Sequence, residues 1–130
     1  MHIVIDLQGA QCESRFRGIG RYSLSLARAI ARNRGDHRIT IALNSIFPDS
    51  IDPLKAAFED ILSPGSIRVW QGLEGVHGRD RLNGWRRRAA EHVREGFLAD
   101  LKPDVVLTSS LFEGFADDAV TGVPASAQSY

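Results

Sequence analysis

The stretch that decides the fold is Arg15-Phe16-Arg17-Gly18-Ile19-Gly20-Arg21-Tyr22. It follows a short β-branched segment, Ile3-Val4-Ile5, and opens a long run with apolar residues at helical spacing. A strand, a glycine-containing loop and a helix in this order suit a phosphate, because glycines let the backbone approach a ligand and a helix N-terminus favours negative charge. The pattern therefore predicts an anion site formed by Arg17, Gly18, Ile19, Gly20 and Arg21.

Two details of this stretch concern the kind of anion. Gly18 and Gly20 match the start of the dinucleotide-binding fingerprint, but Ser23 stands at the position of its third glycine. The arginines around the glycines, including Arg15, carry planar guanidinium groups that match phosphate oxygens. A tight turn without a ligand is the alternative, and the motif alone leaves both interpretations open.

The composition is typical of one soluble globular domain. Of the 130 residues, 43% are hydrophobic, and 16 basic residues balance 16 acidic ones. A net charge of zero gives no overall attraction to nucleic acid or anionic lipid, so we expect no nucleic-acid partner and at most a peripheral membrane contact. The N-terminus has no signal-like leader and no apolar run is long enough to span a bilayer, which predicts a cytoplasmic protein.

Metal and thiol chemistry are not expected from this sequence. Cys12 is the single cysteine, which excludes an internal disulfide, and we expect it to be inert. The four histidines are scattered without the spacing of metal ligands, so no metal or bound cofactor is predicted. Only His77 falls in a loop near the expected cleft, as a candidate acid or base.

Strand and helix patterns alternate along the whole chain. Strands are expected at residues 3–5, 38–43, 66–70 and 104–108, with the approach to one more at 124–130, and helices at 19–33, 53–62 and 84–101. Pro53 is expected in the first turn of the second helix, and Asn83 as the N-cap of the third. The alternation predicts an α/β, Rossmann-like domain with a mostly parallel sheet flanked by helices.

The third helix carries an apolar stripe that we expect to face the core. Its members recur at a spacing of four: Trp85, Ala89, Val93, Phe97 and Leu101. A basic run lies beside it, made of Arg79, Arg81, Arg86, Arg87 and Arg88. This run suits anionic lipid or a pyrophosphate, and a solvated helix face is the simpler alternative.

Ligands of such sheets bind outside the carboxyl ends of the strands, and polar side chains follow these ends here. The candidates that could reach a ligand are Asp6, Gln8, Gln11, Ser109, Ser110 and Glu113. Asp6 has an alternative, since an aspartate at a strand end often caps a turn or pairs with an arginine.

With these motifs placed, the chain resembles the N-terminal half of group 1 (family 4) GT-B glycosyltransferases of bacterial polysaccharide and O-antigen biosynthesis. The resemblance is carried by residues 3–9, 14–22 and 109–115, and it covers essentially all 130 residues as one N-terminal domain, 1–130. It implies a retaining transferase in which two Rossmann-like domains enclose the active site.

The resemblance also implies the roles of the candidate residues. The glycine loop, with Arg17, Gly18, Ile19, Gly20 and Arg21, would approach the phosphate of a nucleotide-sugar donor, with GDP-mannose suggested by the subgroup. The saccharide or lipid-linked acceptor would be held by Asp6, Gln8, Ser109, Ser110 and Glu113. No metal is implied, because such enzymes neutralise the leaving diphosphate with basic residues and helix dipoles.

The length departs from the family pattern. A two-domain enzyme needs roughly twice this length or more. We therefore expect residues 1–130 to be a fragment that lacks the donor-binding domain, is inactive alone, and can self-associate through an open sheet edge. The alternative function is a non-catalytic phosphate- or nucleotide-binding Rossmann module, which Asn44 disfavours because a ribose-binding carboxylate would stand there.

Overall fold

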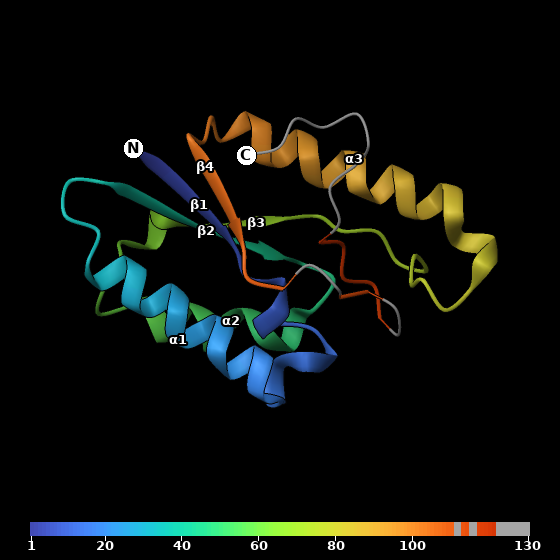
Figure 1. Ribbon diagram of the computed structural model, residues 1–130, viewed down its shortest axis with the longest axis horizontal. Coiled ribbons are helices and arrows are strands. Elements are labelled where there is room, and N and C mark those ends of the chain that lie inside the picture. Colours follow the sequence, from blue (N-terminus) through green and yellow to red (C-terminus); the bar gives the residue numbers. More distant parts are fainter. Residues whose placement is uncertain (111–112, 115–116, 122–130) are drawn as a thin grey trace.

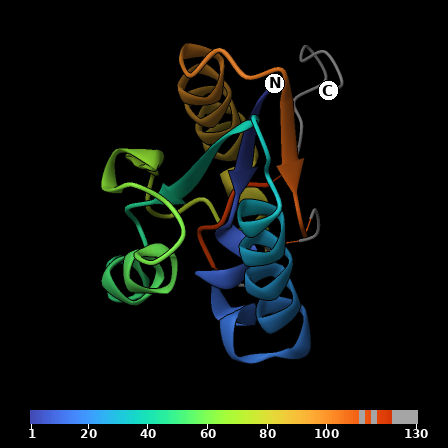
Figure 2. The same cartoon turned by 90° about the vertical axis from the view of Figure 1, so that its left-hand side faces the viewer.

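A computed structural model describes residues 1–110, 113–114 and 117–121 of the chain. Their core is a parallel sheet of four strands: β1 (His2–Asp6), β2 (Arg38–Asn44), β3 (Ile67–Trp70) and β4 (Val105–Thr108). The strand order is β3-β2-β1-β4, with Ile5 level with Ile41 on one side and Leu107 on the other. Helices α1 and α2 cover one face and α3 covers the other (Figures 1 and 2). The predicted Rossmann-like α/β class is confirmed.

The helices follow the predicted alternation. They are α1 (Gly18–Arg32), α2 (Pro48–Phe58) and α3 (Gly84–Asp100). Four single turns of 3-10 helix connect the elements: η1 (Gln8–Ala10), η2 (Glu13–Phe16), η3 (Pro64–Ser66) and η4 (Arg81–Asn83). Among the described residues, no helix combines the length and apolar character needed to cross a membrane. The strand expected at residues 124–130 lies outside the described residues.

The structure corrects the prediction for the second helix. We expected it at 53–62, but α2 begins at Pro48 and ends at Phe58, so that Pro53 lies inside it. Pro48 suits the first helical position, where the missing N–H has no intrahelical partner in any case. The carbonyl that Pro53 leaves without a donor belongs to Asp49, which is exposed and therefore open to water.

Two apolar layers hold the helices to the sheet. On the α1 and α2 face, buried side chains of the strands pack against Ala27, Ala31, Leu54 and Phe58. On the α3 face, a smaller cluster joins Val4 and Ala42 to Leu98. Because successive strand residues point to opposite faces, β1 contributes Ile5 to the first layer and Val4 to the second.

The orientation of α3 differs from the prediction. Phe97 and Leu101 pack inward as expected, but Trp85 is 69% exposed and Val93 is 44% exposed. The buried positions of α3 are instead Ala90, Arg94 and Leu98. The helix is turned so that Arg94 reaches the sheet, and the first half of the predicted stripe faces outward.

The start of α3 also differs in detail. Asn83 occupies the N-cap position, but its side chain makes no capping hydrogen bond. The Asn83 amide instead donates to the carbonyl of His77 at 3.2 Å. This residue therefore ties the preceding loop to the helix rather than capping α3.

The core layer makes a direct prediction about stability. Phe58 is fully buried, so Phe58→Ala should lower the free energy of unfolding by about 3–5 kcal/mol through lost burial and a residual cavity. Phe16→Ala is the matched control, because Phe16 is 71% exposed and its loss should change stability by about 0.5 kcal/mol or less. Urea denaturation of both variants measures the difference, and similar values would contradict this packing.

Candidate functional site

The loops that follow β1 and β4 meet at the carboxyl edge of the sheet. Gly9 makes this contact possible, because a Cβ there would lie 3.2 Å from Cβ of Ser110 and 3.2 Å from Oγ of Ser23. Contacts this short would force the neighbours apart. The predicted candidates after β1 and β4 are therefore brought together as expected for adjacent parallel strands.

A buried ion pair lies beneath this edge. Arg94 Nε donates to Asp6 Oδ2 at 2.6 Å, and the side chains are only 4% and 1% exposed. Arg94 also donates to Oγ1 of Thr108 at 3.2 Å, at the end of β4. One guanidinium thus links α3 to the ends of the neighbouring strands β1 and β4. The arginine partner that the sequence left open for Asp6 is present in the structure, although the sequence did not indicate which arginine it is.

Gln8 extends this network to the segment beyond β4. Its amide nitrogen donates to Asp6 at 3.1 Å and to the carbonyl of Val120 at 2.6 Å. Its carbonyl oxygen accepts from the Val120 N–H at 2.9 Å and from the Asn44 amide at 3.1 Å. Asp6 and Gln8 are buried and bonded to the protein itself, so this structure gives them a positioning role. Their predicted contact with an acceptor stays a prediction.

A second polar cluster surrounds Glu113. Its carboxylate accepts hydrogen bonds from Ser110 at 2.8 Å, Ser14 at 2.9 Å and the thiol of Cys12 at 3.2 Å. Two predicted residues, Ser110 and Glu113, thus meet, and the sequence analysis missed Ser14 as their partner. Oγ of Ser109 is buried without a hydrogen-bond partner among the described residues.

The thiol of Cys12 is unreactive in this environment. Burial raises the pKa of its thiol from 9.0 to about 12; a backbone hydrogen bond with Ser14 opposes the rise and the Glu113 carboxylate adds to it. A thiol with this pKa stays protonated at neutral pH and is a poor nucleophile. The inert role expected for Cys12 agrees with the structure.

The predicted glycine loop forms the start of α1. Arg17 is the N-cap residue and its side chain makes no capping hydrogen bond, and a Cβ at Gly18 would meet nothing within 4 Å. Gly20 has another reason to be glycine, because a Cβ there would collide with the backbone of Ser14 and Arg15. The open approach is therefore at Gly18, whereas Gly20 allows η2 to pack against α1.

The two arginines of the glycine loop lie on the surface. Arg17 donates to Glu13 at 3.2 Å, with side chains 68% and 43% exposed, so the pair is well solvated. Arg21 is exposed one turn into α1, and Ile19 between them is 40% exposed. Of the predicted anion-site residues, Arg17, Gly18, Ile19 and Arg21 thus share one exposed helix end, whereas Gly20 is buried. Their contact with a phosphate stays a prediction.

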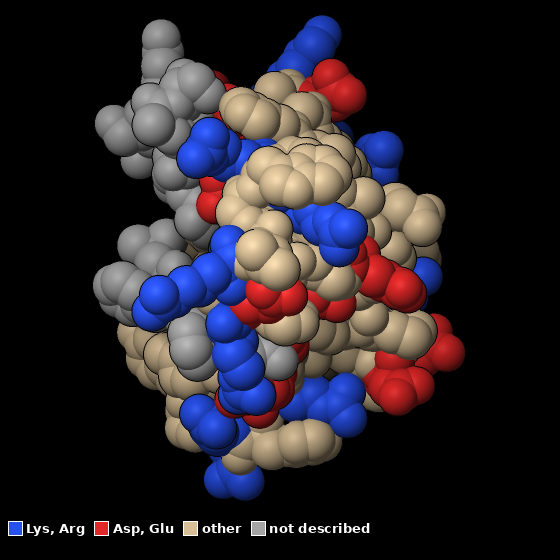
Figure 3. Space-filling model, turned by 90° about the vertical axis from the view of Figure 1, so that its right-hand side faces the viewer, with Lys and Arg blue, Asp and Glu red and all other residues tan. Residues whose placement is uncertain are grey.

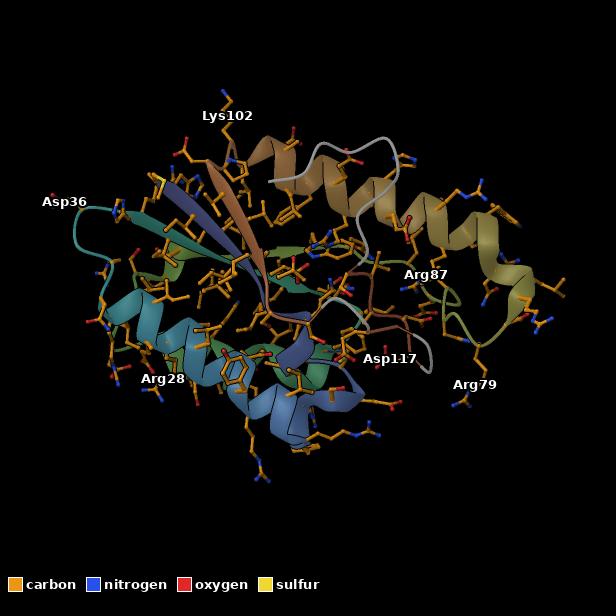
Figure 4. All side chains as sticks on the ribbon, viewed as in Figure 1. Arg28, Asp36, Arg79, Arg87, Lys102 and Asp117 are labelled. Carbon is orange, nitrogen blue, oxygen red and sulfur yellow. The ribbon has the colours of Figure 1, made fainter. Side chains whose placement is uncertain are left out.

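Arg87 differs from the rest of the predicted basic run. Its guanidinium donates to four carbonyls, those of Val76, Glu113, Gly114 and Ala119, at 3.1–3.3 Å. Figure 4 shows it pointing from α3 toward the segment after β4. Arg87 therefore holds the loop that carries Glu113 and is not available to a pyrophosphate or a lipid in this arrangement.

A hollow of about 290 Å³ lies beside the Glu113 cluster. Its lining includes Gln11, Arg15, Phe47 and Asp49, from the loop after β1 and the start of α2. Gln11 is engaged by the protein, since its amide nitrogen donates to the Asn44 carbonyl at 3.0 Å. Arg15, Phe47 and Asp49 offer a cation, a ring and a carboxylate. The sequence analysis missed Phe47 and Asp49, which follow β2 without any motif.

The described residues contain no cluster of side chains that could bind a metal ion. Within residues 1–110, 113–114 and 117–121, no three His, Cys, Asp or Glu side chains are grouped to hold a metal ion. His77, half-buried in the loop before η4, takes part in neither the Asp6 network nor the Glu113 cluster described above.

The buried ion pair predicts a non-additive mutant cycle. Arg94→Met leaves the Asp6 charge buried without its partner and should cost about 3–5 kcal/mol in the free energy of unfolding. The double variant Asp6→Asn/Arg94→Met removes both charges. Its loss in the free energy of unfolding should be smaller than the sum of the losses of the two single variants. Urea denaturation of the four proteins tests this, and strictly additive losses would contradict a coupled pair.

The Cys12 thiol predicts a loss of stability in alkali. Between pH 9 and about 12 the unfolded chain loses the thiol proton while the folded protein keeps it, so the free energy of unfolding falls as pH rises through this range. Cys12→Ala lacks this proton and should show a shallower decline. Denaturation of both proteins at pH 8 and pH 10.5 measures the difference; parallel pH profiles would count against the raised pKa.

Comparison with known proteins identifies relatives by sequence alone. No protein-family model matches the chain, and no solved structure matches it significantly. A serotype-specific mannosyltransferase WbdA of Escherichia coli is 38% identical over 126 residues, which is 96% of this chain and 15% of the relative. Two further WbdA mannosyltransferases of Escherichia coli are 33% and 30% identical over 101 residues, or 77% of this chain and 12% of each relative. The chain therefore spans 15% or less of the length of these curated relatives. The resemblance to bacterial glycosyltransferases of polysaccharide biosynthesis is confirmed, and this chain is homologous over nearly its whole length to a segment of the WbdA mannosyltransferases.

Proposed function

We propose that this chain is the acceptor-side part of a glycosyltransferase that moves a sugar from a nucleotide-sugar donor to a saccharide or lipid-linked acceptor. The observation that carries the proposal is the 38% identity to a mannosyltransferase across 96% of the chain. The name of that relative also supports a mannose donor, and GDP-mannose is the donor we propose. A retaining outcome is part of the proposal through the family resemblance.

The donor diphosphate is assigned to the start of α1. The first N–H groups of a helix have no intrahelical partner, and here the side chain of the N-cap residue, Arg17, does not cap them. Gly18 leaves space for a phosphate oxygen, and the exposed Arg17 and Arg21 add positive charge beside it. This arrangement supports the stabilisation of a leaving diphosphate without a metal ion.

The acceptor is assigned to the neighbouring edge of the sheet. Ser109 offers a hydroxyl without a partner among the described residues, and Glu113 with Ser110 offers a carboxylate cluster. The hollow lined by Arg15, Phe47 and Asp49 adds groups that can bind sugar hydroxyls and stack on a sugar ring. In the transfer, the bond from the anomeric carbon to the donor phosphate oxygen breaks, with its electron pair leaving on the diphosphate. A bond from the anomeric carbon to an acceptor hydroxyl oxygen forms, and the proton of that hydroxyl passes to the leaving diphosphate.

The alternative of a nucleotide-binding module is less well supported. Asn44, at the position of the expected ribose-binding residue, is fully buried. Its side chain donates to Gln8 at 3.1 Å and accepts from the Ile46 N–H at 3.0 Å. A fully buried side chain held in this way is not exposed to a ribose in a solvent-facing cleft.

Gly18→Asp tests the donor assignment in the protein encoded by the full reading frame that contains residues 1–130. A Cβ at this position would meet nothing within 4 Å, so we expect the substitution to be compatible with folding, but the carboxylate would repel a phosphate. Mannose transfer from GDP-mannose to a mannose-terminated oligosaccharide should fall by roughly 100-fold. Gly65→Asp is the matched control, because a Cβ at Gly65 also meets nothing, and its activity should stay within about twofold.

Two results would overturn the proposal. Absence of transfer from a panel of nucleotide sugars would remove the glycosyltransferase function. Equal activity of Gly18→Asp and Gly65→Asp would leave the transferase in place but would move the donor phosphate away from α1. Thermal unfolding of both variants must match the parent protein for either comparison to count.

A further inference from the structure

Large apolar side chains project into solvent where α3 begins. Leu82 in η4 is 83% exposed and Trp85 in the first turn of α3 is 69% exposed. Val93, two turns further along, continues the same side of the helix and is 44% exposed. Trp85 and Val93 belong to the stripe that was expected in the core, but α3 is turned so that Arg94 faces the sheet and these two side chains face outward.

Arginines surround these apolar side chains. Arg81, Arg86 and Arg88 are exposed, and the Arg86 guanidinium lies 5.5 Å from the centre of the Trp85 ring. Asp80, next to Arg81 in the sequence, accepts a hydrogen bond from the Leu82 N–H at 2.9 Å and so caps η4. Figure 3 shows basic side chains gathered on the side of the molecule where α3 begins. We call Arg81, Leu82, Trp85, Arg86 and Arg88 the η4–α3 surface.

The fold gains no stability from this surface. Cations at a helix N-terminus oppose the helix dipole. Exposed Leu82 and Trp85 leave apolar area in water that burial would remove. The combination is unfavourable for the isolated chain, and it becomes favourable only when an anionic, partly apolar partner covers it.

We infer that the η4–α3 surface docks on an anionic lipid membrane. Tryptophan prefers the headgroup level of a bilayer, and arginine pairs with lipid phosphates while leucine enters the acyl boundary. The formal net charge of the chain is zero, so attraction to an anionic bilayer must come from a local basic group such as this one. Leu82 and Trp85 are exposed at a helix end, which suits a deformable lipid layer better than the shaped surface of a protein. This inference does not depend on the proposed transferase activity.

A second exposed apolar group provides the comparison. Phe16 is 71% exposed, Tyr22 is 58% exposed, and both lie near the start of α1. There Arg17 is paired with Glu13, and the Arg15 guanidinium covers the Phe16 ring at 4.4 Å. A matched pair of apolar variants can therefore separate the two surfaces: Leu82→Ala/Trp85→Ala and Phe16→Ala/Tyr22→Ala.

Vesicle co-sedimentation tests the inference with the full chain. Binding is expected to vesicles containing phosphatidylglycerol and not to pure phosphatidylcholine, and it should weaken as salt is raised. Arg81→Glu/Arg88→Glu should lower the affinity by about 25-fold or more, since each arginine near an anionic bilayer is worth about fivefold. Arg38→Glu/Arg68→Glu makes the same charge change at exposed positions on β2 and β3, and should cost much less.

Tryptophan fluorescence locates the contact. Trp70 is 3% exposed, so quenching by brominated lipid reports mainly on Trp85. Quenching on phosphatidylglycerol vesicles, with loss of binding in Leu82→Ala/Trp85→Ala, supports the docking surface. Three results would overturn it: no vesicle binding, an equal loss in Phe16→Ala/Tyr22→Ala, or binding without quenching of Trp85. If the partner were an acidic protein and not a membrane, the protein would not bind vesicles.

Discussion

The ion pair between Arg94 and Asp6 fixes how this domain is put together. Two charges at 4% and 1% exposure are unfavourable apart, so the 2.6 Å contact is required once either is buried. Asp6 ends the central strand β1, and Arg94 also donates to Thr108 at the end of β4. The pair therefore decides which side of α3 faces the sheet and holds the two strand ends from which the candidate site is built.

The loops at the carboxyl edge are held by polar contacts more than by apolar packing. Gln8 binds both main-chain groups of Val120, and Arg87 binds four carbonyls around Glu113. Each of these side chains is used to position a loop that carries a candidate ligand group. The groups that we assign to a ligand lie on these loops and at the start of α1: Ser109, Glu113 and the open backbone at Gly18. A binding site requires both kinds of residue: side chains that hold the loops in position and groups that contact the ligand.

The rotation of α3 has a second consequence on the outer surface. Turning Arg94 inward places Ala90 and Leu98 on the same inner side and turns Trp85 and Val93 outward. One buried pair thus links the interior of the site to the basic and apolar surface at the start of α3. This link explains why that surface carries large apolar residues that helical periodicity alone would assign to the core.

The sequence by itself determined the parallel α/β class, the strand segments and the strand–glycine–helix unit at Gly18. These depend on local periodicity, β-branched runs and turn residues, which act over a few neighbouring positions. It also placed Ser110 and Glu113 at the edge where they meet, because adjacent parallel strands end together. Only the tertiary structure decided that Arg94 pairs with Asp6 across 88 positions, that Gly20 is required by the backbone of Ser14, and that α2 starts before Pro53. Contacts between distant segments leave no periodic signal in the sequence. An arginine in an amphipathic helix is therefore predicted to face solvent, and only the three-dimensional structure identifies a buried partner.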